Sequence, residues 1–434
     1  METVFERVFV ETPVDTDQDG QYDLIAVYIK RPKLDEKVPA VFVANPYMLH
    51  CNEDWYDLYD VNTDIQAYPT QDISQEEITF HPKKPVVCPK KAVKETVLSS
   101  PYPEPDSSEY ECISDLYAHL LERGYAGVFS GGLGTKGSDG LTITGSEEEV
   151  LAFKSVIDWL NGRTRAFTDK SRTVQVLAEW CTGLVAMSAR SYLGTMCIGV
   201  AATGVEGLKT ILPEAGISNW YEYYRHNGLT LPAMDWQGDD LDILAKYCFS
   251  RALDPEDFAS IQPLFEASQK ALQEGEDRRS GNYNRFWDER NYLQHADRIQ
   301  ASVFILQGLN DWNVKPDQGI RLFEKLQELG KERMMLLHQG QHIYTYHLEG
   351  SPTLALIDRW LDYYLKGIDT GIQNEAKIYV ENNLDQTQWM QENVWPPKGN
   401  KTYRIPDQGI KSIIDDLSQT VYDRKEKNTQ AWLD

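Results

Sequence analysis

Three residues of types that together activate a nucleophile occur in this chain in the order Ser191, Asp311 and His342. A serine hydroxyl attacks a carbonyl carbon only when a neighbouring base takes its proton, and an imidazole held by a carboxylate is a common base. We therefore assign Ser191 as the nucleophile and His342 as the general base. Asp311 would orient the imidazole and stabilise its charged form. This set would perform acyl transfer through a covalent acyl-enzyme.

Each of these three residues follows an apolar run that predicts a β-strand. The runs are residues 183–187 before Ser191, 303–307 before Asp311 and 334–337 before His342. Residues 192–202, directly after the serine, are compatible with a helix. A strand, a sharp turn with serine at its tip and a helix form the nucleophile elbow of α/β-hydrolases, and Ser, Asp, His is the chain order of that fold. The sequence therefore predicts an α/β-hydrolase.

The predicted elbow departs from the usual pattern at one position. Ala189 stands two residues before the serine, where a glycine is typical. We expect the extra methyl group to be tolerated if the backbone dihedral angles permit it, and otherwise to strain the turn. An acyl-transfer site also needs hydrogen-bond donors for the oxyanion. The backbone N–H of Tyr192 is one such donor, and the hydroxyl of Tyr47, after an early strand, is a candidate for the second.

Three other patterns were weighed against this chemistry. Residues 132–137 match Gly-x-Gly-x-x-Gly, but no helix follows to meet a pyrophosphate, so a loop is predicted. Residues 15–20 imitate the start of a calcium-binding loop, but Ala26 stands where a bidentate Glu belongs, so a hairpin turn is the better interpretation. The histidines at 338, 342 and 347 follow a strand and lack helical ligand spacing. We predict no metal and no cofactor.

Composition narrows the class of protein further. The 434 residues carry a formal net charge of −24, which argues against nucleic acid as a partner. The charge serves solubility or, alternatively, favours cationic substrates. The six cysteines form no Cys-x-x-Cys pair, so neither a disulfide framework nor a zinc site is predicted. No signal peptide and no apolar run of 18 residues is found, so we expect a cytoplasmic protein without membrane contact.

The chain is too long for one compact core, so we expect a main domain with insertions. Residues 1–205 and 301–372 are assigned to the hydrolase domain, with an irregular insertion at 48–112. Residues 206–300 are rich in helix-forming, aromatic and acidic residues and are predicted to form a helical cap between nucleophile and acid. Residues 373–434 are predicted to be a polar tail that begins a truncated C-terminal β domain.

Five segments of this sequence resemble the Xaa-Pro dipeptidyl-peptidases of lactic acid bacteria and their relatives. These segments are residues 190–195, 203–208, 216–225, 311–316 and 338–342. The resemblance runs from about residue 5 to 380. It implies an enzyme that releases an N-terminal dipeptide when proline or, less well, alanine is second. Ser191, Asp311 and His342 match the family triad, and Tyr47 matches its oxyanion tyrosine.

The resemblance also implies roles in substrate binding. Trp220 falls where the family lines its proline pocket, and a flat aromatic wall suits the weakly polar pyrrolidine ring. Asp239 falls where relatives place a glutamate near the substrate's amino group, and Asn313 where an asparagine helps to hold the same end. Without the resemblance, core packing, a helix start and a turn would be the preferred interpretations of these three residues.

The predicted function is therefore a serine exopeptidase acting on proline-containing peptides with a free N-terminus. Two alternatives stay open: an esterase or amide acylase of the cocaine-esterase type, and a catalytically silent fragment. The family is longer, with a helical N-terminal domain and a C-terminal β domain, and its N-terminal domain is implicated in a homodimer. The sequence leaves undecided the preferred first residue, the peptide length limit and the oligomeric state.

Overall fold

The computed structural model describes residues 2–64, 69, 72–88, 96–104, 115–230 and 236–398. Residues 1–395 cluster as one compact unit. A second unit comprises 396–434, of which only 396–398 are described. No helix in these ranges is both long and apolar enough to cross a membrane. The predictions for 399–434, and for the parts of the 48–112 insertion at 65–68, 70–71, 89–95 and 105–112, lie outside the described residues.

The described residues contain one mixed sheet of thirteen strands in the order β13-β12-β11-β10-β9-β8-β3-β5-β2-β1-β6-β7-β4. The strands are β1 (Thr3–Glu11), β2 (Leu24–Pro32), β3 (Val38–Ala44), β4 (Thr96–Leu98), β5 (Ala126–Ser130), β6 (Ala166–Phe167), β7 (Val174–Val176), β8 (Cys181–Arg190), β9 (Leu208–Glu214), β10 (Ser302–Gly308), β11 (Arg333–His338), β12 (Ile378–Glu381) and β13 (Trp389–Glu392).

The central strands run parallel from β5 through β3, β8, β9, β10 and β11 to β12, and β2 pairs antiparallel with β5. Every residue of β3 and of β10 is buried, as expected for parallel strands that are covered on both faces. The strand order from β1 to β11, with β2 antiparallel, is that of the α/β-hydrolases. The predicted fold class is confirmed.

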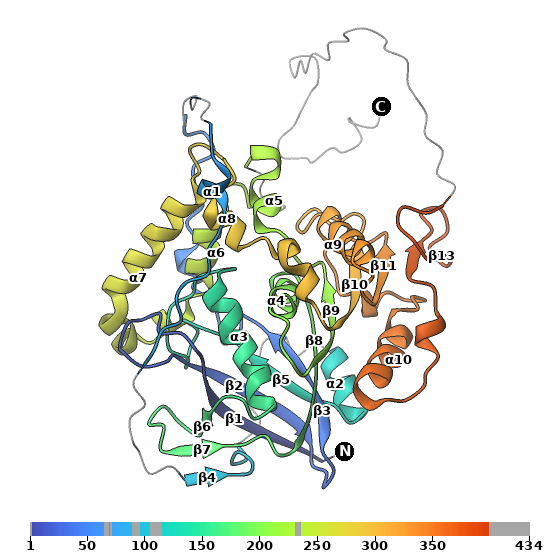
Figure 1. The fold of residues 1–434 in the computed structure, drawn as a ribbon, viewed down its shortest axis with the longest axis horizontal. Coiled ribbons are helices and arrows are strands. Elements are labelled where there is room, and N and C mark those ends of the chain that lie inside the picture. Colours follow the sequence, from blue (N-terminus) through green and yellow to red (C-terminus); the bar gives the residue numbers. More distant parts are fainter. Residues whose placement is uncertain are drawn as a thin grey trace. The chain divides into compact units, whose positions relative to one another are not determined.

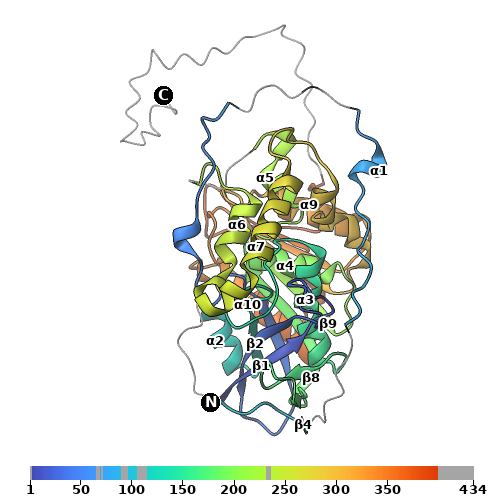
Figure 2. The ribbon, with the colours of Figure 1, turned by 90° about the vertical axis from the view of Figure 1, so that its left-hand side faces the viewer.

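Helices cover both faces of the sheet (Figures 1 and 2). On one face lie α2 (Asp115–Glu122) and α10 (Thr353–Lys366), which are joined by ion pairs of Arg123 with Asp358 and Asp362. On the other lie α3 (Glu147–Leu160), α4 (Tyr192–Ala201) and α9 (Asp317–Glu328). The α4 helix is buried over its whole length because it packs between α3 and the sheet. It therefore fixes the position of the residue that precedes it, Ser191.

The remaining helices, labelled α5 to α8, lie together above the central strands in both views (Figures 1 and 2). They are α5 (Trp220–Tyr224), η2 (His226–Gly228), α6 (Leu241–Cys248), η3 (Ser250–Leu253), α7 (Pro255–Glu276) and α8 (Arg285–Glu289). Other short elements are η1 (Glu53–Trp55), α1 (Gln75–Ile78), η4 (Tyr292–Arg298), η5 (Thr345–His347) and η6 (Ile372–Asn374). We refer to residues 215–300, which carry α5 to α8, as the cap.

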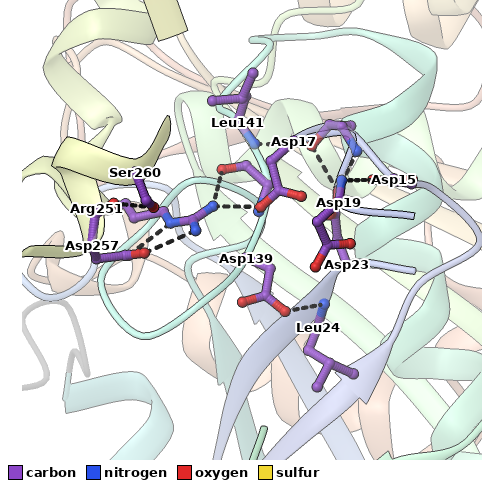
Figure 3. A network of polar contacts seen from close by, with 12 residues as sticks. Asp15, Asp17, Asp19, Asp23, Leu24, Asp139, Leu141, Arg251, Asp257 and Ser260 are labelled. Atoms are coloured by element: carbon purple, nitrogen blue, oxygen red, sulfur yellow. Dashed lines mark hydrogen bonds and ion pairs between the residues drawn. The ribbon is translucent and has the colours of Figure 1, made fainter. Parts of the chain in front are cut away.

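The acidic segment at 15–20 is the predicted hairpin turn, because β1 and β2 on either side of it pair antiparallel. Figure 3 shows that this turn reaches the cap. Asp17 accepts a hydrogen bond from Arg251 of η3 at 2.7 Å, and Arg251 also binds Asp257 of α7 through two nitrogens at 2.7 and 2.9 Å. Such charge-assisted, bidentate pairs are the stronger ones. The turn between β1 and β2 is therefore tied to η3 and α7.

Two predicted boundaries need correction. The cap was predicted to begin at residue 206, but Leu208–Glu214 is β9, a central strand between β8 and β10. Lys209 and Pro213 interrupt its apolar pattern, which concealed the strand. The tail was predicted to begin at residue 373, but β12 and β13 extend the main sheet, and the compact unit continues to Trp395. By contrast, 132–137 is a loop, as predicted.

Candidate active site

The predicted strand–turn–helix around Ser191 is present. Ser191 lies between β8 and α4 with φ 66° and ψ −132°, a backbone conformation that non-glycine residues rarely adopt. Its N–H donates to the backbone oxygen of Glu214 at 2.8 Å, and its own carbonyl oxygen accepts from the Thr195 hydroxyl at 2.9 Å. These contacts hold the strained turn in place, as is typical of strain at functional sites.

The alanine at position 189 does not strain this turn. Ala189 belongs to β8 and has no positive φ, so its methyl group meets no conformational penalty. The close approach occurs instead at Gly194 of α4. A Cβ atom there would lie 2.7 Å from the Ala189 carbonyl oxygen and 2.8 Å from the Glu214 carbonyl oxygen. The glycine that lets helix and strands pack in this chain is therefore Gly194.

Asp311 and His342 are brought together by the ends of β10 and β11, which are parallel neighbours. Nδ1 of His342 lies 2.7 Å from Oδ2 of Asp311. The other carboxylate oxygen of Asp311 accepts the backbone N–H groups of Asn313 and Val314 at 2.9 and 3.0 Å. This arrangement fixes the ring orientation and leaves Nε2 as the atom available to a serine hydroxyl.

Ser191 and His342 line one cavity of about 940 Å³. Within the described part of the chain no hydrogen bond links the two side chains, and such bonds often tighten only when substrate is bound. Asp239, Asn313 and Tyr47 line the same cavity. The structure therefore gathers six of the eight predicted site residues around one space, counting Asp311 through its bond to His342.

Tyr47 follows β3, and its ring meets the ring of Tyr192 edge-on with centroids 5.8 Å apart. Desolvation raises the pKa of the Tyr47 hydroxyl well above its usual range, so this group stays protonated and can donate a hydrogen bond. Tyr192 is the first residue of α4, and its backbone N–H therefore lies at a helix N-terminus, where anions are favoured. The two residues predicted to supply the oxyanion donors are thus in contact through their rings.

Asp239 and Asn313 present polar groups to the cavity from two different elements. Oδ2 of Asp239 accepts from the Tyr224 hydroxyl at 3.2 Å, and the Tyr56 hydroxyl, which also lies at the cavity, is a second donor to this carboxylate. Burial raises the pKa of this carboxyl group to about 7. Oδ1 of Asn313 accepts from the Tyr223 hydroxyl at 2.7 Å. The hydrogen-bond donors printed for this buried carboxylate are neutral hydroxyl groups, and such a group beside a cavity is suited to a cationic ligand.

Trp220 lies elsewhere than predicted. It is fully buried and does not line the cavity. Its ring meets Tyr192 edge-on at 5.3 Å and stacks on Tyr224 at 6.2 Å. Trp220 therefore supports the wall from behind, and Tyr223 and Tyr224 of the same helix face the cavity.

Several residues that line the cavity were not predicted from the sequence. They are aromatic and come from the insertion and the cap: Trp55, Tyr56, Tyr223, Tyr224, Trp236 and Tyr247. The dense run of aromatic residues at 220–224 was a visible signal. Its spacing alone could not tell a cavity wall from core packing.

Two groups of described residues place three potential metal ligands within 4.8 Å of one another: Glu222, His226 and Asp317, and Asp15, Asp17 and Asp19. In the first group Arg321 lies 3.4 Å from Glu222 and 3.5 Å from Asp317. In the second Arg251 pairs with Asp17. An arginine thus already compensates each group. The described histidines at 338, 342 and 347 form no such group. We assign no metal to these residues.

Comparisons with known proteins identify the family of this chain. Residues 19–344 match the X-Pro dipeptidyl-peptidase (S15 family). The chain is 39% identical over 388 residues to the Xaa-Pro dipeptidyl-peptidase of Lactiplantibacillus plantarum, covering 88% of this chain and 47% of that protein. It is 39% identical over 396 residues to that of Lacticaseibacillus casei, covering 89% and 49%. The chain spans about half the length of these curated relatives.

Solved structures share the fold. A CocE/NonD family hydrolase from Staphylococcus aureus superposes with a TM-score of 0.55 at 16% identity, over 92% of this chain and 57% of the other. An aminopeptidase from a marine sediment archaeon, Thaumarchaeota archaeon, gives 0.53 at 15% identity, over 91% and 60%. At this identity the likeness concerns the fold alone. The sequence match over 19–344 goes further, and on that ground the chain belongs to the X-Pro dipeptidyl-peptidase family, S15.

Proposed function

We propose that this chain carries a serine exopeptidase site that releases Xaa-Pro dipeptides from peptides with a free N-terminus. Ser191 attacks the carbonyl carbon of the second residue, and His342 takes the hydroxyl proton and returns it to the leaving amine. Tyr47 and the backbone N–H of Tyr192 stabilise the oxyanion. Water activated by His342 then hydrolyses the acyl-enzyme. No cofactor is required by these steps.

The observation that carries the proposal is the buried carboxylate of Asp239 in the cavity of Ser191 and His342. A substrate ammonium group would pair with this carboxylate, and Asn313 would help to hold the same end. An acylated N-terminus has no charge to offer and would leave the buried carboxylate uncompensated. This feature favours an aminopeptidase over an esterase that takes uncharged acyl groups.

Specificity for proline in the second position is proposed to come from the aromatic wall. Tyr223 and Tyr224 would contact the pyrrolidine ring, and Trp220 would support these two rings from behind. A ring with little polar surface gains most from flat aromatic contact. We also propose the division of the chain into a hydrolase domain and a cap at 215–300 that supplies this wall. A homodimer and a cytoplasmic location remain expectations from the sequence.

The proposal is tested by the release of p-nitroaniline from Ala-Pro-p-nitroanilide, compared with the N-acetylated substrate. We expect cleavage of the free-amine substrate alone, and no cleavage by Ser191→Ala. Preferred cleavage of the acetylated substrate or of simple esters would favour the acylase alternative. Folded protein that cleaves none of these substrates would contradict an active peptidase in this chain.

A further inference from the structure

The loop that carries His342 is bound by the side chain of the residue next to the nucleophile. Arg190, directly before Ser191, donates from Nη1 to the backbone oxygen of His342 at 3.0 Å. Its guanidinium carbon lies 4.0 Å from the centroid of the Tyr344 ring, within the range of a cation–π contact. The Arg190 side chain thus contacts two residues of the loop that carries His342, which we call the histidine loop.

A second connection comes from the end of β9. The side chain of Glu214 accepts hydrogen bonds from both the backbone N–H and the hydroxyl of Thr345. The backbone oxygen of the same glutamate accepts the N–H of Ser191 at 2.8 Å. Glu214 therefore binds the nucleophile turn with its main chain and the histidine loop with its side chain.

This glutamate is only 4% exposed, and burying a carboxylate is costly unless it is paired and hydrogen-bonded. Burial raises the pKa of Glu214 to about 7, although the two bonds from Thr345 and the charge of Arg190 act in the opposite direction. The nearby charge of Asp311 raises it further. An apolar side chain could fill this position without the free-energy cost of burying a carboxylate. The presence of a carboxylate therefore indicates that its hydrogen bonds have a role.

We propose that Glu214 and Arg190 are positioning residues that set the His342 loop at its working distance from Ser191. Ser191 and His342 follow different strands, β8 and β11, and contacts between the ends of these strands help to fix their separation. The three residues 190, 191 and 214 form one rigid frame, because Ser191 is covalently linked to one and hydrogen-bonded to the other. The inference rests on the proposed function only in taking Ser191 and His342 as the reacting pair.

The test uses Glu214→Ala, Glu214→Gln, Arg190→Met and the milder Thr345→Val. Each variant is measured by the rate of fluorophosphonate labelling of Ser191 and by kcat and KM on Ala-Pro-p-nitroanilide. Thr210→Val is the matched control, because Thr210 is a buried residue of the same strand that binds Ser302 and Trp360 away from the site. Thermal unfolding of every variant reports the stability.

We expect Glu214→Ala to slow labelling and kcat by about 100-fold with KM little changed, since a misplacement of about 1 Å costs about that much. Arg190→Met and Thr345→Val should lose about 10-fold. Glu214→Gln keeps an acceptor oxygen for the Thr345 N–H and should restore most of the rate. Thr210→Val should lower the melting temperature without changing either rate.

Three results would each contradict either the positioning role, the proposed substrate or the serine chemistry. Labelling rates of folded Glu214→Ala and Thr345→Val equal to the parent rate would refute the positioning role. Labelling without turnover of Ala-Pro-p-nitroanilide would refute the proposed substrate and leave the positioning test intact. Folded parent protein that resists the probe would refute both the serine chemistry and the positioning role.

Discussion

The cavity has two walls that are built by different means. The wall with Ser191, Asp311 and His342 stands on the ends of three strands, and backbone hydrogen bonds hold each of these residues. The other wall comes from the cap and the insertion at 48–112, and it presents aromatic rings with a single deeply buried carboxylate, Asp239 of the cap. The sheet wall carries groups that must meet within tenths of an ångström. The cap wall carries groups that select a ligand by shape and charge.

This difference predicts that changes in the cap wall alter which substrate is accepted, and changes in the sheet wall alter the rate for every substrate. The largest effect that sharpens this contrast is expected for Asp239→Asn. Losing the charge partner of a buried ammonium costs about 2–5 kcal/mol, so kcat/KM for Ala-Pro-p-nitroanilide should fall by at least about 30-fold. Fluorophosphonate labelling of Ser191 should be unchanged.

The matched control is Asp242→Asn, a buried carboxylate three residues along that binds Tyr59 and Gln273 and does not line the cavity. This variant should change kcat/KM by no more than about threefold, which corresponds to less free energy than a typical hydrogen bond contributes. Equal losses in both variants would show that the cap tolerates no change here, and the proposed ammonium site would be wrong.

Gly194→Ala probes the sheet wall through packing. The added Cβ would press on the carbonyl oxygens of Ala189 and Glu214 and displace α4, which carries the Tyr192 N–H at its start. Overpacking of this kind costs about 1–3 kcal/mol of unfolding free energy. Chemical denaturation should show this loss, and kcat should fall for all substrates. A fall confined to free-amine substrates would contradict the division between the walls.

The pH dependence gives a further test. The carboxyl group of Asp239 has a pKa near 7, so below this pH it is neutral and binds an ammonium poorly. The ratio of kcat/KM for Ala-Pro-p-nitroanilide to that for p-nitrophenyl acetate cancels every effect of pH that acts on both substrates alike. This ratio should rise about tenfold per pH unit up to pH 7, and fall again above about pH 8, where the α-amino group of the substrate loses its proton. A ratio independent of pH would separate Asp239 from substrate binding.

The smallest effect is expected for Ala189→Gly, which restores the usual residue of the elbow. Because Ala189 has ordinary strand dihedral angles, the glycine gains nothing and costs about 0.5–1 kcal/mol of stability. Activity should stay within about twofold. A large gain in kcat would show that the alanine strains the elbow after all.

The sequence predicted most of the fold because its central strands are continuous apolar runs with clear ends. It also predicted the triad, since residues at the ends of neighbouring parallel strands must lie on one edge of the sheet. It missed β9, where Lys209 and Pro213 break the pattern, and it extended the tail over β12 and β13. Strand pairing of short segments depends on partners far away in the chain, which a local pattern does not contain.

By itself, the sequence determined which residues stand at strand ends, because hydrophobic periodicity and chain order are local properties. Only the tertiary structure decided that Trp220 supports the cavity wall from behind, that Gly194 is where α4 packs closely on the elbow, and that Glu214 and Arg190 bind the histidine loop. Each of these depends on the distance between side chains from separate strands and helices. That distance is set by packing of the whole sheet and its helices.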